Sequence, residues 1–145
     1  MAELLLIVRM AGRRVAIRAG EVEAVVELEG VTPVPRSAAH IAGLSALRSR
    51  VLTVIDSRVS LCLAPDASAS LAEAIVVPSG GHTYALLVEQ IEDVAEASGE
   101  PAPVQASPGP GWERIAVGMI DAGDDLLLLV DPHAIIAGPP ALQAA

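Results

Sequence analysis

Short apolar segments separated by turn residues are the feature of this sequence that most constrains its fold. Most of the segments are rich in β-branched residues, and residues 14–18, which hold Val15 and Ile17 between two arginines, are expected to form a half-buried strand. This pattern is typical of an all-β sandwich or barrel and argues against a helical bundle. The predicted strands span residues 4–9, 14–18, 41–47, 51–56, 73–78, 83–88, 114–120 and 125–131, and residues 91–95 are expected to be a strand or a turn.

Turn residues predict how several of these strands are connected. Ala11 and Gly12 predict a hairpin after the first strand, and residues 79–82, which contain two consecutive glycines, predict another. The valines of residues 21–28 fit one face of a helix or a strand equally well. We expect a short turn of helix that runs into a strand there.

Prolines predict the irregular parts of the chain. Residues 31–35 contain two prolines and are expected to be an extended loop, because each proline removes a backbone donor and fixes φ. Residues 99–112 hold four prolines and three glycines and are expected to form a long loop. A short helix is predicted at residues 132–136, and residues 137–145 are expected to be a frayed tail.

About ten short strands in a chain of 145 residues predict a mostly β fold, built as two small barrels that share one body. Closing into barrels also covers the strand edges that such apolar hairpins would otherwise expose. The core is expected to be aliphatic, because the sequence is 52% hydrophobic yet contains no Phe, one Tyr and one Trp.

Charge and hydropathy argue against some classes of partner. The formal net charge is −9, whereas proteins that stack nucleic-acid bases need a basic groove and aromatic platforms. Residues 1–8 are short for a signal peptide and lack its basic start, and no run approaches about twenty apolar residues. We therefore expect a cytoplasmic protein that neither binds nucleic acid nor inserts directly into a membrane.

The residues that could carry chemistry do not assemble into a known catalytic motif. No Gly-x-Ser-x-Gly motif is present, and His40, His82 and His133 each lie beside a predicted turn, where an exposed or capping histidine is usual. Cys62 stands between two leucines and is expected to be a buried structural thiol. We therefore predict no catalytic residue, no cofactor and no metal; an enzyme that pairs His40 or His82 with a nearby Asp is the alternative.

Residues 40–58 form the most distinctive stretch of the sequence. They resemble the signature of CheW-like domains, which reads approximately Gly-Val-x-Asn-Leu-Arg-Gly-x-Val-x-Pro-Val-Ile-Asp-Leu-Arg. Weaker resemblances to the same family run from residue 4 to residue 136, in the family's order. The positions of the signature that match in register are Gly43, Leu47, Arg48, Val51, Val54, Ile55, Asp56 and Arg58.

The resemblance implies both a fold and a function. Its fold would be a single CheW-like domain over residues 1–145, made of two closely packed, SH3-like, five-stranded β-barrels with short helical turns, one near the C-terminus. Its function would be that of a non-catalytic adaptor in chemotaxis. Such adaptors bind the regulatory domain of a CheA-type histidine kinase and the cytoplasmic tip of methyl-accepting chemoreceptors, and so are recruited to receptor arrays at the membrane.

The resemblance also implies which residues contact these partners. Arg48 is the arginine of the signature, beside Leu47, and Val22 and Val25 lie in a segment that contributes to partner binding. Gly43 and Leu44 lie on a strand that lines the junction between the barrels. A scaffold role stays open for two of the residues: Arg48 could form a structural salt bridge, and Gly43 could admit a close backbone approach.

Some positions depart from the family pattern. Ala24, Ala46, Ser49 and Thr53 stand where the family has Glu, Asn, Gly and Pro. Losing a carboxylate and an amide removes polar contacts worth roughly 1 kcal/mol or more each at an interface. The alternative function is therefore a divergent paralogue that binds one partner and attenuates or redirects kinase signalling.

Overall fold

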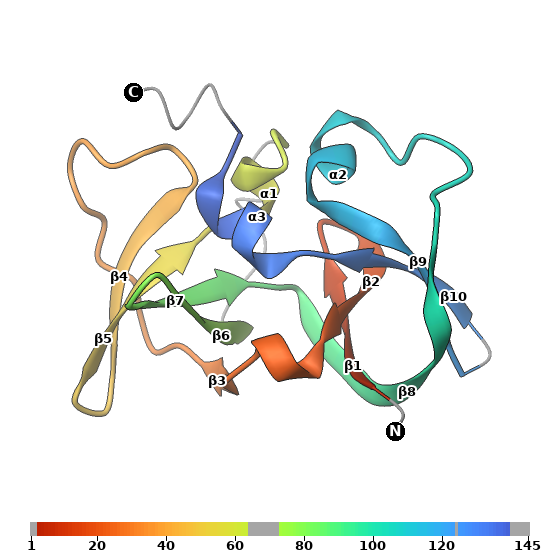
Figure 1. Ribbon diagram of the computed structural model, residues 1–145. Helices are drawn as coiled ribbons and strands as arrows, with labels where there is room; N and C mark the ends of the chain where they lie inside the picture. The colour runs from red at the N-terminus through yellow and green to blue at the C-terminus, as the bar shows by residue number, and fades with distance from the viewer. Residues whose placement is uncertain (1–2, 64–72, 124, 140–145) are drawn as a thin grey trace.

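The computed structural model describes residues 3–63, 73–123 and 125–139, and strands dominate them (Figure 1). Within this part of the chain, ten strands form two sheets of five, and four short helical segments connect or cover them. The elements in chain order are β1 (Leu4–Met10), β2 (Arg13–Arg18), η1 (Ala19–Glu21), β3 (Ala24–Glu27), β4 (Ile41–Leu47), β5 (Arg50–Ile55), α1 (Ser57–Ser60), β6 (Glu73–Ser79), β7 (His82–Leu87), β8 (Gln90–Ala102), α2 (Pro110–Ile115), β9 (Ala116–Ala122), β10 (Asp125–Val130) and α3 (Pro132–Ala137).

The first sheet is a closed barrel that combines both ends of the chain. Its strand order is β1-β2-β10-β9-β8, and the only parallel pair among these described strands joins β2 to β10. In Figure 1 the red β1 and β2 lie beside the blue-green β8, β9 and β10. Residues far apart in sequence therefore meet throughout this barrel.

The second sheet is built from the middle of the chain. Its order is β3-β6-β7-β5-β4, with β5 and β7 parallel and the other described pairs antiparallel. The loop before β4 adds one isolated bridge, in which Thr32 pairs with Leu44. Together the two sheets confirm the predicted mostly β fold of two five-stranded units.

The hairpin turns form where the sequence predicted them. Ala11 and Gly12 have φ of 51° and 80°, and Gly80 and Gly81 have φ of 57° and 84°. Two consecutive residues with positive φ match the twist of the flanking strands, which is why short hairpins favour glycine there. Both turns are confirmed.

One aliphatic core joins the two sheets. Its buried members come from β1, β2 and β10 of the barrel and from β5, β6 and β7 of the second sheet, with Trp112, Ile115 and Ile135 added by the helices. A smaller cluster fills the barrel and another lies on the opposite face of the second sheet. The residues that join the sheets include Val8, Met10, Ile17, Ile55, Ile75, Val77 and Leu86.

The proline-rich segment is more ordered than predicted. The expected loop at residues 99–112 instead begins as the end of β8, which runs to Ala102, and ends in the first turn of α2. Pro110 occupies the first turn of this helix, where its missing N–H costs nothing. Because α2 continues to Ile115, β9 begins at Ala116 and not at residue 114 as predicted.

The segment after β5 also differs from its prediction. Asp56 caps α1 by accepting the N–H groups of Arg58 and Val59 at 3.0 and 3.3 Å. The prediction of a buried Cys62 is wrong: the residue is exposed and has φ of 62°, so its side chain does not follow that of the buried Leu61.

None of the helices in the described ranges is long and apolar enough to cross a membrane.

The C-terminal segment packs against the rest of the protein as far as residue 139. Asp131 caps α3, which matches the helix predicted at residues 132–136. Gly138 is buried against the imidazole of His40, and Pro139 is buried as well, so the predicted fraying does not include these two residues. The remaining predicted tail, residues 140–145, lies outside the described residues.

Arg114 ties the three α-helices together. From α2 it donates to the backbone oxygen of Ala134 in α3 and, through Nη2, to the backbone oxygen and Oγ of Ser60 in α1 at 2.8 and 3.0 Å. Ser60 Oγ in turn donates to the Ile135 carbonyl at 2.7 Å. Burial lowers the pKa of Arg114, but the guanidinium keeps its charge at neutral pH.

We expect Arg114→Met to lower the free energy of unfolding by about 2 kcal/mol, because hydrogen bonds from a charged donor are worth about 1.5–3 kcal/mol and their acceptors would be left unpaired. Urea titration followed by circular dichroism measures the change. Arg36→Met is the control, since Arg36 is exposed and has no hydrogen bond or ion pair within the described residues. Equal stability of the two variants would contradict the role given to Arg114.

Candidate functional site

Three of the six residues predicted to bind partners line one groove. Val25 enters it from β3, whereas Leu47 and Arg48 enter it from the end of β4 and the turn after it. The groove has a volume of about 250 Å³. Its lining is completed by Glu23, Ala24, Val26, Arg50 and Val76.

The groove exists because the second sheet curves until its two edges face each other. β3 and β4 are the terminal strands of that sheet and do not pair with each other. Arg50 Nη1 forms a salt bridge with Glu23 Oε2 at 2.7 Å, and Arg50 Nη2 donates to Thr83 Oγ1 at 2.8 Å. A surface ion pair of this kind adds at most about 1 kcal/mol of stability, but it links the start of β5 to the residue before β3 across the groove.

Arg48 is an exposed cation at the rim of this groove. Within the described part of the chain it takes part in no hydrogen bond or ion pair, unlike the neighbouring Arg50. Its φ of 58° places it in the left-handed region, which directs the turn between β4 and β5. The guanidinium is therefore available for a bidentate hydrogen-bonded contact with a carboxylate of another molecule.

The floor and the outer margin of the groove are apolar. Ala24 and Val26 pack with Leu47 on the cluster of the second sheet. Val25, which lines the groove, is 47% exposed, and Val51, which lies outside the groove and pairs with Ala46 across the hairpin, is 66% exposed. Sequence reasoning matched Val51 to the family signature but did not name it as a contact residue, although an exposed valine next to Arg48 suits an interface.

The other predicted contact residues lie outside the groove. Val22 is half-buried against the core shared by the two sheets. Gly43 is buried, and a Cβ on it would lie 2.2 Å from the backbone oxygen of Thr32. Leu44 is 39% exposed beside the same Thr32 bridge. The structure thus confirms the close backbone approach at Gly43, while partner binding by these three residues stays a prediction.

The histidines bond to groups other than carboxylates. His40 is buried, contrary to the expectation of an exposed or capping residue, and its Nε2 lies 2.8 Å from the Ile136 backbone oxygen. His133 Nδ1 lies 3.1 Å from Ser79 Oγ, and His82 is exposed at the β6–β7 hairpin. Across the described residues, no imidazole shares a hydrogen bond with an Asp or Glu side chain, which is the pairing that the enzyme alternative requires.

A larger hollow of about 420 Å³ lies on the barrel, between β9–β10 and residues 104–108. It contains none of the predicted contact residues. The two arginines beside it already have partners: Arg13 stacks over the Trp112 ring at 4.8 Å, and Arg14 Nη1 bonds Asp125 at 3.0 Å. The bonds of Arg14 to Glu92 and Asp125 raise the pKa of Arg14. They also connect β2 to β8 and β10 of the barrel.

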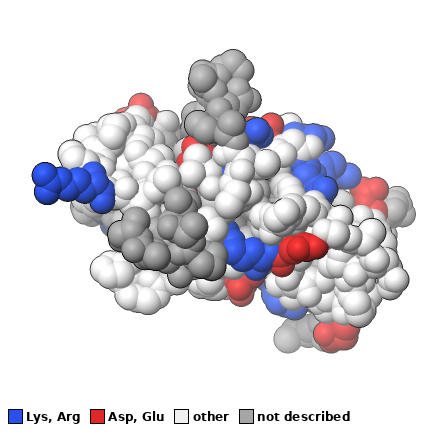
Figure 2. Space-filling model, turned by 90° about the horizontal axis from the view of Figure 1, so that it is seen from above, with Lys and Arg blue, Asp and Glu red and all other residues white. Residues whose placement is uncertain are grey.

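Charge is sparse on the face that carries the short helices. Viewed from above, uncharged side chains make up most of the described surface, and the charged ones occur in separate groups (Figure 2). The formal net charge of −9 is therefore not concentrated on this face.

Comparison with known proteins identifies the relatives of this architecture. The family described as CheW-like domain matches residues 4–139. Among solved structures, the scaffolding protein TtCheW from Thermoanaerobacter tengcongensis has a TM-score of 0.75 and 18% sequence identity, with 90% of each chain covered. At that identity the structural match supports the fold alone. Comparison with curated protein sequences returns no match.

The family match covers nearly the whole chain and includes every residue of the groove, from Glu23, just before β3, to Val76 on β6. The matched fold is the fold described above, with a β barrel and a second five-stranded sheet around one shared core. The chain belongs to the CheW-like domain family, whose members are scaffold and adaptor proteins of chemotaxis.

Proposed function

We propose that this protein is a non-catalytic adaptor that couples chemoreceptors to a CheA-type histidine kinase. The observation that carries the proposal is the groove between β3 and the β4–β5 turn, where Arg48 has no partner among the described residues and lies beside an apolar floor. An adaptor acts by presenting such surfaces, and Arg next to exposed aliphatic side chains is typical of the centre of an interface. The two partners would be the kinase regulatory domain and the cytoplasmic tip of a methyl-accepting chemoreceptor.

The location follows from the same proposal. The protein would reside in the cytoplasm as one domain and reach the membrane only through the receptors that it binds. Val22, Gly43 and Leu44 would act beside the groove: Gly43 by allowing the Thr32 bridge that holds β4, and Leu44 by adding exposed apolar area next to that bridge.

We expect Arg48→Glu to weaken binding to the kinase regulatory domain or to the receptor tip at least about tenfold, since truncating an interface arginine that dominates binding costs about 2 kcal/mol or more and reversing its charge adds repulsion. Isothermal titration calorimetry with each purified partner measures the effect. The thermal midpoint should not change, because Arg48 has no partner within the described residues.

Arg36→Glu is the matched control for that experiment. Arg36 is also an exposed arginine without a hydrogen bond or ion pair within the described ranges, and its φ of 66° is close to that of Arg48. Arg36→Glu therefore makes the same charge reversal at a residue with a similar backbone conformation that lies outside the groove. Unchanged affinity of Arg48→Glu for both partners would refute the assignment of Arg48.

A second candidate function is attenuation of kinase signalling by a paralogue that binds one partner. Ala46 supports it, because this alanine is exposed beside Val51 where the resemblance expects an asparagine, so one polar contact at the surface is missing. Kinase autophosphorylation assays with receptor and increasing amounts of this protein separate the two functions. Coupling predicts a rise in phosphorylation, and attenuation predicts a fall when a standard coupling protein is also present.

A further inference from the structure

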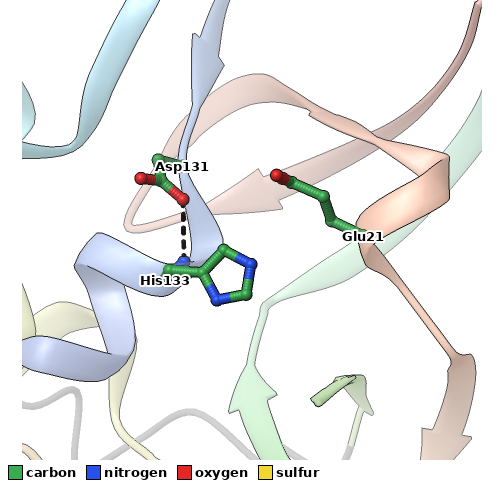
Figure 3. Close-up of side chains that lie close together, drawn as sticks. All are labelled: Glu21, Asp131 and His133. Atoms are coloured by element: carbon green, nitrogen blue, oxygen red, sulfur yellow. Dashed lines mark hydrogen bonds between the residues drawn. The ribbon is translucent and has the colours of Figure 1, made fainter. Parts of the chain in front are cut away.

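Three metal-ligating side chains meet where the chain crosses between the two sheets. Glu21 ends η1, Asp131 caps α3, and His133 lies in the first turn of α3. One ligand atom from each of the three lies within 4.8 Å of the other two. Figure 3 shows the Glu21 carboxylate and the His133 ring facing each other across the space between η1 and α3.

We propose that Glu21, Asp131 and His133 form a binding site for a divalent transition-metal ion, with Zn²⁺ as the preferred ion. The proposal does not depend on the adaptor function. An imidazole nitrogen with two carboxylates is a donor set that Zn²⁺ accepts, with water completing the tetrahedron, whereas Mg²⁺ and Ca²⁺ prefer oxygen donors alone.

The histidine is already oriented for this role. Its Nδ1 lies 3.1 Å from Ser79 Oγ on β6, which leaves Nε2 as the nitrogen free to bind an ion. Metal-bound histidines commonly have their second nitrogen fixed by an oxygen in this way, because the hydrogen bond sets the tautomer and the ring orientation. Ser79 thus acts as a positioning residue from a third segment of the chain.

The two carboxylates retain capacity for a cation. Asp131 Oδ1 accepts the backbone N–H of His133 at 2.9 Å, but a carboxylate has about four lone-pair sites, so the cap does not exhaust it. Glu21 accepts no hydrogen bond within the described residues, and no Arg there pairs with Glu21 or Asp131. Both carboxylates are half-buried, so a nearby cation would be screened less than at the open surface.

The spacing requires only a short adjustment. Ligand atoms around one tetrahedral Zn²⁺ lie about 3.4 Å apart when the metal–ligand bonds are about 2.1 Å. Atoms now within 4.8 Å would need to approach by roughly 1.4 Å or less, which the rotatable side chain of Glu21 can provide. Binding would then connect the crossover segment before β3 to the helix after β10.

Calorimetric titration of the full chain with ZnCl₂ tests the proposal. The expected result is one Zn²⁺ per chain with a dissociation constant in the micromolar range, and no comparable binding of Mg²⁺ or Ca²⁺. Glu21→Gln and His133→Gln should each abolish this binding. Asp131→Asn should do the same while keeping α3 capped, because asparagine is an equally good N-cap. Ser79→Ala should weaken binding roughly tenfold.

His82→Gln is the control, since His82 is an exposed histidine on the same hairpin as Ser79 and lies outside the cluster. It should bind Zn²⁺ as the wild-type chain does. A second readout is the thermal midpoint, which Zn²⁺ should raise in the wild-type chain and not in His133→Gln. Wild-type affinity in His133→Gln, loss of binding in His82→Gln, or absence of saturable binding would each overturn the proposal.

Discussion

Replacing Gly43 by alanine should lower the free energy of unfolding by at least about 3 kcal/mol, through backbone strain and overpacking together. Gly43 has φ of 149°, which an L-residue with a side chain rarely adopts. The added Cβ would also lie 2.2 Å from the Thr32 backbone oxygen and 2.7 Å from its carbonyl carbon. Neither atom can move without breaking the Thr32–Leu44 bridge, whose hydrogen bonds are 2.8 and 2.9 Å long.

Gly20→Ala is the matched control for this substitution. Gly20 has no atom within 4 Å of a built Cβ and no positive φ, so the same methyl group should change stability little. Urea denaturation of both variants measures the difference. If Gly43→Ala were as stable as Gly20→Ala, the loop before β4 would not pack as the structure shows.

The second large effect is expected in the core that joins the two sheets. Leu86 is fully buried there, so Leu86→Ala should cost about 2–5 kcal/mol, the usual range for removing a buried leucine side chain. Because this cluster contains residues of both sheets, the loss should destabilise both together. Thermal unfolding followed by Trp112 fluorescence reports on the barrel side, and amide exchange of β6 and β7 reports on the second sheet.

Leu126→Ala provides the comparison, because this leucine of β10 is 59% exposed and the chemical change is identical. Its cost should stay within about 0.5 kcal/mol, as is usual for surface positions. A Leu86→Ala variant in which the second sheet unfolds well before the barrel would contradict a shared core.

Much of the fold could be predicted because its signals are local. Alternation and β-branched residues depend on neighbours in sequence, so the positions of the strands were predicted well. The glycines at residues 80 and 81 mark a hairpin for the same reason. The parallel pairs β2–β10 and β5–β7 carry no such signal, since their partners are joined through long connections.

The errors have equally specific causes. Of the prolines that predicted a loop at residues 99–112, Pro101 lies in β8 and Pro110 in the first turn of α2, positions that tolerate proline, whereas the loop itself is confined to residues 103–109. The leucines beside Cys62 predicted a buried thiol, but a positive φ turns this residue to the surface. His40 is buried because Gly138 and the end of α3 pack on it. The neighbours of His40 in the sequence could not predict this contact, because α3 lies far along the chain.

The candidate site was predictable only in part. The signature identified Arg48 and Leu47 by position, and an upstream segment identified Val25. That these residues line one groove depends on the curvature of the second sheet and on the Glu23–Arg50 ion pair, which links residues 27 positions apart. The cluster of Glu21, Asp131 and His133 was missed because its members are separated by most of the chain.

The order of the barrel strands has a consequence for synthesis. A ribosome releases β1 and β2 first, yet their barrel partners β8, β9 and β10 begin only at Gln90. The second sheet, from Ala24 to Leu87, is complete before that point. The apolar β1–β2 hairpin therefore waits for its barrel partners while residues 19–89 are synthesised, and over that interval the second sheet is the part of the fold that can form and cover it.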